Sequence, residues 1–305
     1  MNAKMPKLAF LGIGLMGKPM AARLLDAGYA VTLWNRNRAK AEALLAQNAP
    51  GAQIAATPAA AVAEADVVIT MLEAGPIVAE VLQAALPGLS AGTLVIDMSS
   101  TAQAEAQALH VKLAGRGVHF LDAPVSGGVL GAEQGDLAIM VGGSSEDFRR
   151  AVPVFDVLGR PTRVGGPGCG QLAKLCNQLI VGGTINIVAE ALLLAQAGGA
   201  DPEAVRAAIR GGFAESRILE VHGARMLERN FLPGGQVKSQ AKDMHNILNA
   251  ASAAGVHLAL TELVTARYDS ILPTIPHADH SAALIALEQA NPGKRVGTTP
   301  DELPD

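Results

Sequence analysis

The chain has 305 residues, of which 50% are hydrophobic and 17% are charged, and its 24 Lys+Arg against 28 Asp+Glu leave a formal net charge of −4. This length predicts two domains with well-buried cores. The composition excludes disorder over most of the chain, because disordered segments combine low hydrophobicity with high net charge. No long basic run is present and only 3% of the residues are aromatic, so we expect no nucleic-acid partner.

The cysteines and the N-terminal residues indicate in which cellular compartment the protein lies. On a helix, Cys169 and Cys176 would lie about 10 Å apart along the axis, too far for a disulfide bond, which fits a reducing environment. The first seven residues lead directly into an apolar run, so we expect no signal or transit peptide. We also expect no membrane-spanning helix. The sequence therefore predicts a cytoplasmic protein with no membrane partner.

Residues 1–166 are predicted to form a Rossmann-type α/β domain. Short apolar runs alternate with amphipathic stretches, and the runs are continuous enough for strands that helices cover on both faces. This alternation predicts a parallel, doubly wound sheet. The expected strands are 8–11, 30–34, 66–72, 93–98, 119–123, 137–141 and 162–164.

Beyond residue 166 only helices are predicted. Residues 167–197 read as one long interdomain helix, and 198–292 as an all-α domain. Residues 293–305 are rich in Pro, Gly and polar side chains, which predicts a loose tail. The expected helices of the all-α domain are 202–211, 215–229, 239–255, 258–272 and 281–289.

The first motif is the run Gly12-Ile13-Gly14-Leu15-Met16-Gly17, which follows the first strand and opens a helix. The first glycine allows a tight turn, the second allows a pyrophosphate to approach the backbone, and the third packs helix on strand. The free N–H groups of the helix start favour an anion. The alternative is a glycine-rich turn without a ligand. Because strand and helix flank the motif correctly, we predict a dinucleotide site.

The end of the second strand indicates which dinucleotide binds. An NAD site usually has a carboxylate there for the ribose 2′-OH, whereas this chain has Asn35 and Arg36, followed by Arg38 and Lys40. The planar guanidinium of Arg36 suits a 2′-phosphate. Arg38 and Lys40 alone are equally typical of a solvated helix start. The pattern favours NADP over NAD.

Ser126-Gly127-Gly128 follows the strand that begins at His119. In an open α/β sheet, ligands bind outside the carboxyl ends of the strands. A hydroxyl group and consecutive bare N–H groups there suit a carboxylate. A Pro/Gly loop needed only for its geometry explains the segment equally well.

The long helix carries a lysine among apolar residues. Lys174 shares one face with Gln171, Asn177 and Gln178. A lysine on a mostly buried helix is costly unless it is paired or does chemistry, and burial would lower its pKa, as proton transfer near neutral pH requires. The alternative is a lysine that extends to the surface. Lys242-Asp243, on a later helix, reads by itself as a surface pair.

Together these motifs resemble the β-hydroxyacid dehydrogenase family, which includes 3-hydroxyisobutyrate dehydrogenases and tartronate semialdehyde reductases. The stretches occur in the family's order and span residues 8 to about 250. They are Phe10-Leu11-Gly12-Ile13-Gly14-Leu15-Met16-Gly17-Lys18-Pro19-Met20, Asp122-Ala123-Pro124-Val125-Ser126-Gly127-Gly128, Gly168-Cys169-Gly170-Gln171 through Lys174 and Asn177, and Lys242-Asp243.

The resemblance implies a role for each matching position. Lys174 would be the proton donor and acceptor for the substrate oxygen, Asn177 would bind substrate, and Ser126, Gly127 and Gly128 would hold its carboxylate. Cofactor contacts carried over in the same way fall on Met71, Leu72, Thr101 and Lys242, in addition to residues 12–17 and 35–36.

Three segments depart from the family's pattern, at Glu73, at Gly234-Gly235 and at Arg217. They shape the pocket wall, so they affect the choice of substrate more than the chemistry.

The sequence thus predicts an NADP-dependent enzyme that interconverts a small 3-hydroxy acid and its semialdehyde, without a metal. Overall likeness favours tartronate semialdehyde (2-hydroxy-3-oxopropionate), with methylmalonate and succinate semialdehydes as alternatives. Two alternatives lie outside this class, an imine reductase and a non-catalytic nucleotide sensor. Both would be expected to lack a lysine at the position of Lys174. The Ala- and Leu-rich helical domain predicts a homodimer or homotetramer.

Overall fold

A computed structural model describes residues 5–46 and 51–304. The chain divides into two compact units, residues 1–174 and 175–305. The boundary falls within one continuous helix, α8 (Cys169–Ala197). The first turns of α8 therefore belong to the first unit, and the rest of the helix belongs to the second. This long helix is the one that the sequence predicts at 167–197.

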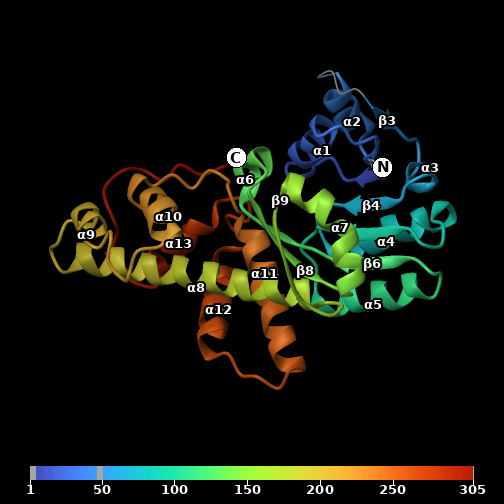
Figure 1. The fold of residues 1–305 in the computed structure, drawn as a ribbon. Helices are drawn as coiled ribbons and strands as arrows, with labels where there is room; N and C mark the ends of the chain where they lie inside the picture. Colours follow the sequence, from blue (N-terminus) through green and yellow to red (C-terminus); the bar gives the residue numbers. More distant parts are fainter. Residues whose placement is uncertain (1–4, 47–50, 305) are drawn as a thin grey trace. The chain divides into compact units, whose positions relative to one another are not determined.

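The first unit contains one sheet. Its strands are β1 (Leu8–Leu11), β2 (Val31–Trp34), β3 (Ala52–Ile54), β4 (Val67–Thr70), β5 (Leu94–Asp97), β6 (His119–Asp122), β7 (Val125–Ser126), β8 (Leu137–Gly142) and β9 (Gly159–Gly165). In the described residues their order is β3-β2-β1-β4-β5-β6-β8-β7, with β9 paired to β8 (Figure 1). From β3 to β6 every neighbouring pair is parallel. The predicted Rossmann-type architecture is confirmed.

Helices cover both faces of this sheet, because alternate strand residues point to opposite sides. On β1, Leu8 and Phe10 join one apolar cluster, whereas Ala9 and Leu11 join another. The first cluster includes residues of α1 (Gly17–Asp26), α2 (Arg38–Leu45) and α7 (Ser145–Leu158), and the second includes residues of α3 (Pro58–Val62), α4 (Gly75–Ala85) and α5 (Gln103–Ala114).

Two details of the sheet differ from the prediction. β8 runs antiparallel to β6 and β7, because the chain reaches it through the short α6 (Gly128–Gln134) instead of a full crossover on one face. β3 and β7 are not among the predicted strands. They have three and two residues, too few to show a hydrophobic period.

The second unit is helical, as predicted. Its core consists of one apolar cluster that includes Leu175, Ile185, Met244 and Tyr268. After α8 the chain forms α9 (Pro202–Ala208), α10 (Arg217–Glu228), α11 (Val237–Ala253), α12 (Ala259–Ile271), the 3-10 turn η2 (His280–Ala282) and α13 (Ala283–Gln289).

By length and composition, α8 could cross a membrane, and it is the one helix of the described residues with that property. However, Ile185, Ala189 and Leu192 of α8 belong to the core of the second unit, and Gln171 and Asn186 are buried polar residues. These are the contacts of a core helix. Cys169 and Cys176, at its start, are both free thiols.

The C-terminal segment is held in place, which corrects the prediction of a loose tail. The backbone of Glu302 pairs with that of Asn230, and Val296 is buried. The buried guanidinium of Arg229 binds Asp301 in this segment and Glu288 at the end of α13. The prediction from polar composition was wrong because a charged residue of this segment, Asp301, is a partner of the buried Arg229.

Candidate functional site

The turn between β1 and α1 has the geometry of a dinucleotide site. Gly12 has φ = +109°, and a Cβ there would overlap the carbonyl oxygen of Met71, so glycine is required. A Cβ on Gly17 would overlap the carbonyl oxygen of Gly12. A Cβ on Gly14, in contrast, would meet nothing within 4 Å. The turn is thus closed on the protein side and open where a phosphate group would approach.

The end of β2 is fastened to this turn. Asn35 Oδ1 accepts a hydrogen bond from the backbone N–H of Ile13 at 2.9 Å, and Asn35 Nδ2 donates to the carbonyl oxygen of Asn37 at 2.8 Å. Both ends of the Asn35 amide are therefore used to hold the backbone. Leu15 is 85% exposed on the same turn. The structure therefore gives Asn35 a positioning role beside the predicted cofactor contact.

A cavity of about 240 Å³ lies next to this turn. Arg36 lines it, and within residues 5–46 and 51–304 its side chain has no hydrogen bond or ion pair. The neighbouring Arg38, by contrast, is paired with Glu42 at 2.8 Å. Arg36 thus remains available to a phosphate. The residues lining the cavity include Gly12, Gly14, Asn35, Met71 and Leu72, all predicted cofactor contacts.

The loop after β5 is tied to the start of α8. The side-chain oxygen of Gln171 accepts from the N–H of Thr101 at 3.0 Å, and its Nε2 donates to the carbonyl oxygen of Ser99 at 2.8 Å. The hydroxyl of Ser99 in turn accepts from the N–H of Leu72 at 2.9 Å. Thr101 Oγ1 is buried, with no hydrogen-bond partner among the described residues. An orphaned hydroxyl at this strand end fits a ligand group such as a ribose.

Asp97 ends β5 and is fully buried. Its Oδ1 accepts from Thr70 Oγ1 at 2.8 Å and from the N–H of Ser99 at 3.1 Å, but Oδ2 has no partner among the described residues. Burial raises the pKa of Asp97 to about 6, because desolvation outweighs the hydrogen bonds from Ser99 and Thr70. The carboxyl group therefore titrates in a moderately acidic range.

This shift predicts a pH-dependent stability. The folded state keeps the Asp97 proton up to about pH 6, whereas the unfolded chain releases it near 3.8. The free energy of unfolding should therefore fall by about 3 kcal/mol as the pH rises through this window. Asp97→Asn should remove this component. Denaturation followed by the fluorescence of the single tryptophan, Trp34, measures the difference between wild type and variant at pH 4 and pH 7.

Asp26→Asn is the matched control, because Asp26 is exposed on α1. Its pH profile should coincide with that of the wild type. Parallel profiles for wild type and Asp97→Asn would show instead that the pKa of Asp97 does not change on folding.

The loop after β6 forms a concave backbone. Gly127 and Gly128 have consecutive positive φ angles, +141° and +64°, and Gly128 begins α6. Consecutive N–H groups in such a conformation converge on one side and bind anions. Ser126, the last residue of β7, is partly exposed beside them. The structure thus brings the three predicted carboxylate-binding residues together at the strand end.

Asp122 connects this loop to α8. Its buried carboxylate accepts from the N–H groups of Gly168 and Gln171, both at 2.8 Å, and so caps the helix start. Burial raises the pKa of Asp122 against the opposing effect of these hydrogen bonds. A Cβ on Gly170 would overlap the carbonyl oxygen of Asp122, so the helix begins in direct contact with the strand. This contact fixes the first turns of α8.

Lys174 lies on α8 one turn after Gln171 and is partly buried. Its position follows from three anchored elements, namely the end of β5, the end of β6 and the capped start of α8. The first unit therefore holds the glycine turn of residues 12–17, the loop of Ser126-Gly127-Gly128 and the predicted proton donor Lys174 on ends of neighbouring elements. This is where ligands bind in open α/β sheets.

In the second unit, the structure groups the other predicted residues. Asn177 Nδ2 donates to Gln178 Oε1 at 2.9 Å, and Gln178 Nε2 donates to Asp243 Oδ2 at 2.8 Å. Lys242 Nζ lies 3.4 Å from Asp243 Oδ1. The apparent surface pair Lys242-Asp243 is thus part of a polar group with Asn177. Asp243 itself is buried.

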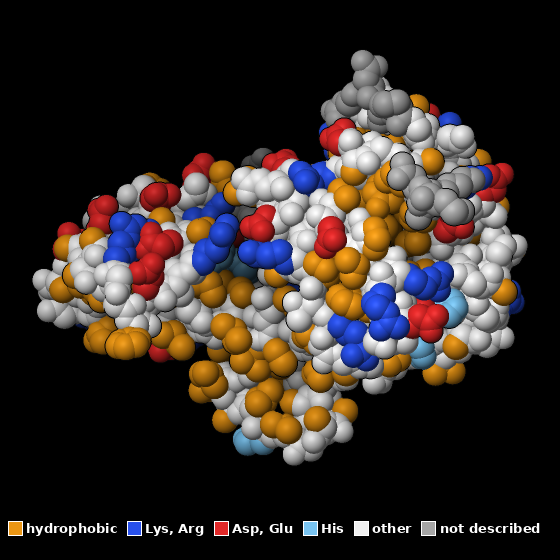
Figure 2. All heavy atoms as spheres, in the orientation of Figure 1, with side chains coloured by type: hydrophobic (Ala, Val, Ile, Leu, Met, Phe, Trp, Pro, Cys, Tyr) orange, Lys and Arg blue, Asp and Glu red, His pale blue; other side chains and the backbone are white. Residues whose placement is uncertain are grey.

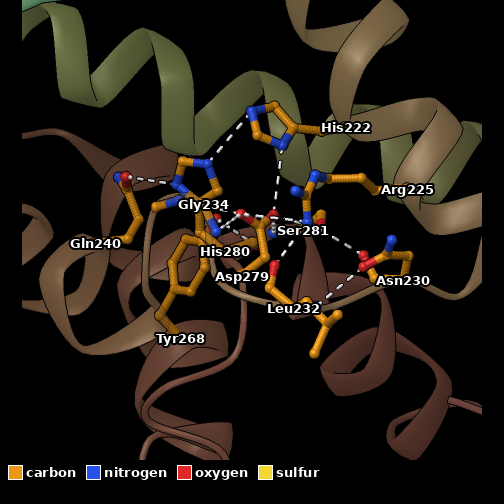
Figure 3. Close-up of polar contacts among 11 residues, drawn as sticks. His222, Arg225, Asn230, Leu232, Gly234, Gln240, Tyr268, Asp279, His280 and Ser281 are labelled. Carbon is orange, nitrogen blue, oxygen red and sulfur yellow. Dashed lines mark hydrogen bonds and ion pairs between the residues drawn. The ribbon is translucent and has the colours of Figure 1, made fainter. Parts of the chain in front are cut away.

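A further polar cluster, which the sequence did not predict, joins α10 to the turn before α13 (Figure 3). The potential ligand atoms of His222, Asp279 and His280 lie within 4.8 Å of one another. Asp279 is fully buried, and each of its oxygens already accepts two hydrogen bonds, from Ser281 and from the N–H groups of Gly234 and Gly235. A metal would displace these donors, so the cluster fits a metal poorly. The absence of a metal remains a prediction.

Burial alone would raise the pKa of Asp279. The interaction with His222, the charge of His280 and the donors of Ser281 outweigh this effect and hold the pKa well below its usual range. The sequence signal of this cluster is the run Asp279-His280-Ser281, in which Asp279 caps η2 by accepting from the N–H of Ser281. The partners in α10 and residues 234–235 are distant in sequence, so only the structure reveals them.

Comparison with known proteins places this geometry in context. A model described as the NAD binding domain of 6-phosphogluconate dehydrogenase matches residues 7–166. A second model, described as NAD-binding of NADP-dependent 3-hydroxyisobutyrate dehydrogenase, matches residues 168–287. Together they cover the sheet domain and most of the helical unit.

Individual relatives agree with these models. The chain is 40% identical over 288 residues to the 2-hydroxy-3-oxopropionate reductase of Escherichia coli, covering 92% of this chain and 97% of that protein. It is 34% identical over 279 residues to the NAD-dependent L-serine dehydrogenase of Pseudomonas aeruginosa, covering 88% and 93%. The structure of 3-hydroxyisobutyrate dehydrogenase from Mycobacterium tuberculosis with L-serine is similar, with a TM-score of 0.86 and 32% identity over 93% of this chain and 99% of that one.

Proposed function

Because the chain belongs to the β-hydroxyacid dehydrogenase family and is an NAD(P)-dependent oxidoreductase, we propose that it reduces a small 3-oxo acid with NADPH, and that 2-hydroxy-3-oxopropionate is its substrate. The observation that carries the substrate is the 40% identity to the Escherichia coli reductase over nearly the full length of both chains. The cofactor preference rests on Arg36, which lines the cavity beside β2 in place of a carboxylate.

The residues present fit a dinucleotide. Gly14 leaves space where the diphosphate would approach, Arg36 is free to bind a 2′-phosphate, and Thr101 Oγ1 is a buried hydroxyl without a partner in the described chain. Ile13, Leu15, Met16 and Lys242 remain predicted contacts. When bound, NADPH supplies a hydride to the carbonyl carbon of the substrate.

This chain's residues supply the rest of the reaction. Lys174 would donate a proton from Nζ to the carbonyl oxygen, so that, with the hydride that bound NADPH would supply, the aldehyde would become an alcohol. Its ammonium charge also stabilises the developing alkoxide, which removes the need for a metal. Ser126, Gly127 and Gly128 hold the carboxylate, and Asn177 orients the substrate. In the reverse direction Lys174 accepts the proton.

Replacing Arg36 tests the cofactor assignment. Arg36→Ala should raise the KM for NADPH about 10- to 100-fold, because charge-assisted hydrogen bonds to the phosphate are lost. The KM for NADH should change little. Arg38→Ala is the matched control, because Arg38 already pairs with Glu42. Equal effects of the two substitutions, or equal losses with NADH and NADPH, would contradict the assignment.

A substrate panel tests the reaction. NADPH oxidation is measured with tartronate, methylmalonate and succinate semialdehydes, and NADP⁺ reduction with L-serine, because a serine dehydrogenase is among the relatives. The highest kcat/KM is expected with tartronate semialdehyde. A higher value with another compound would transfer the assignment to it. NADPH binding without turnover of any of the four would favour an imine substrate or a sensing role.

We also propose that the protein is a cytoplasmic homodimer or homotetramer, with no nucleic-acid or membrane partner. Apolar side chains gather where α11 connects to α12 (Figure 2), among them the exposed Val256, Leu260 and Leu263. Ile180, Ile187 and Leu194 are also exposed, at seven-residue intervals on α8. Exposed apolar patches of this kind mark interfaces between protein chains, and light scattering would give the number of copies.

A further inference from the structure

The two histidines of the cluster in Figure 3 lie edge to face. Their ring centroids are 4.5 Å apart, the ring planes are inclined by 82°, and the two Nε2 atoms are 3.3 Å apart. His222 comes from α10 and His280 from η2. At this distance, one Nε2 is protonated and donates a hydrogen bond to the other, because two lone pairs would repel each other.

The other nitrogen of each ring faces an oxygen. His222 Nδ1 is 3.5 Å from Asp279 Oδ1, and His280 Nδ1 is 3.4 Å from Gln240 Oε1. Gln240 Nε2 donates to the carbonyl oxygen of Gln178, which identifies Oε1 as the atom that faces His280. His280 Nδ1 is therefore a donor to Gln240. Figure 3 shows His280 between His222 and Gln240.

The fold leaves room for this ring. The N–H of His280 donates to the carbonyl oxygen of Gly235 at 2.7 Å, and a Cβ on Gly235 would lie 2.9 Å from His280 Cε1. The neighbouring N–H groups of Gly234 and Gly235 are bound by Asp279. The absence of a side chain at Gly235 thus accommodates the imidazole of His280.

Hydrogen bonds continue from His280 to residues of the proposed site. Gln240 Oε1 also accepts from Gln178 Nε2, at 3.4 Å. Gln178 then accepts from Asn177 through Oε1 and donates to Asp243, at 2.9 Å and 2.8 Å. Gln178 therefore connects Gln240 with both Asn177 and the Lys242-Asp243 pair. All of these residues belong to the second unit.

We propose that His280 is a positioning residue for substrate binding, which acts through Gln240 and Gln178 on Asn177, with His222 and Asp279 holding its ring. This inference rests on the proposed function, in which Asn177 orients the substrate. Loss of the Nδ1 donor would remove one of the hydrogen bonds that orient the Gln240 amide and so weaken its contact with Gln178. Asn177 would then lose the acceptor that fixes its own amide.

Three replacements of His280 separate its two nitrogens. Asparagine places an N–H near the position of Nδ1, glutamine places one near Nε2, and phenylalanine keeps the ring without either. His280→Phe and His280→Gln should raise the KM for the semialdehyde about 2- to 10-fold, the effect of one neutral hydrogen bond, with little change in kcat. His280→Asn should stay close to the wild type.

The control is His245→Phe, because His245 lies on α11 but is exposed and bound to Asp269. Its KM should equal that of the wild type. A purely structural role for His280 would reduce the amount of active enzyme, so it would lower kcat in all three variants and leave KM unchanged. That result would overturn the proposal, and so would a loss of activity after removal of metals with EDTA.

A second measurement does not depend on turnover. In the full-length protein, the side-chain amide signals of Asn177 and Gln178 are recorded by ¹⁵N NMR and assigned with single substitutions. They should shift in His280→Phe but not in His280→Asn or His245→Phe. Unchanged signals would overturn the inference even if the enzyme is active. Shifted signals in a protein that reduces no semialdehyde would sustain the coupling and refute only the proposed reaction.

Discussion

Lys174→Ala is expected to lower kcat/KM for the semialdehyde by about 100- to 10,000-fold, the usual contribution of a positioned general acid. The loss should fall mainly on kcat, because the proton is needed when the carbonyl oxygen gains charge. The affinity for NADPH, measured by fluorescence titration, should be unchanged. Lys174 belongs to α8 and not to the nucleotide turn or to the cavity beside β2.

Chemical rescue would distinguish lost chemistry from a disturbed helix. Methylammonium added to Lys174→Ala should restore part of the rate in a saturable manner, because the vacated space admits a small ammonium donor. Lys112→Ala is the matched control, since Lys112 is an exposed lysine that contacts Gln83. A rate within tenfold of the wild type in Lys174→Ala would assign proton transfer to another group.

Arg229→Met is expected to lower the free energy of unfolding by about 3–5 kcal/mol, the usual effect of removing one partner of a buried ion pair. The Arg229 side chain is fully buried, and its nitrogens bind Glu288 at 2.7 Å and Asp301 at 2.6 Å. Methionine keeps much of the length but leaves the carboxylate of Glu288, whose side chain is only 10% exposed, without its main partner. Guanidinium denaturation followed by far-UV circular dichroism measures the loss.

Two further variants make this result specific. Arg295→Met should cost less than about 1 kcal/mol, because Arg295 is 38% exposed and contacts the same two acids from the surface. Adding Glu288→Gln to Arg229→Met should recover part of the stability, because the unpaired charge is removed. A loss in Arg229→Met no greater than that in Arg295→Met would show that the tail does not depend on this ion pair.

Local sequence patterns predicted the elements of the sheet well where burial was continuous. The strands β1, β4, β5 and β6 lie within the predicted runs, since hydrophobic residues covered by helices on both faces leave an unbroken signal. Some helix starts also follow from local residue type. Thr57, Ser144 and Asp201 accept hydrogen bonds from the first turns of α3, α7 and α9, as is usual for Thr, Ser and Asp at this position.

The C-terminal tail shows the opposite case. Its composition is that of a loop, but Asp301 forms an ion pair with Arg229, which is distant in sequence. The backbone of Glu302 also pairs with that of Asn230. The composition of a segment indicates whether that segment alone would be exposed to solvent. It does not indicate whether another part of the chain binds it. The strand β8 itself was predicted, but its antiparallel direction was not, because strand direction depends on how the chain returns to the sheet.

The sequence by itself determined the glycine turn of residues 12–17, the loop of Ser126-Gly127-Gly128 and the place of Lys174 on a helix, because each depends on residues adjacent along the chain or one helical turn apart. Only the tertiary structure decided what fixes them. Asp122 caps α8, Gln171 binds the loop of Thr101, and the imidazole of His280 reaches Gln240, all through contacts between residues far apart in sequence. Local chemistry is encoded in short motifs, whereas its orientation is set by hydrogen bonds that form only when distant segments pack together.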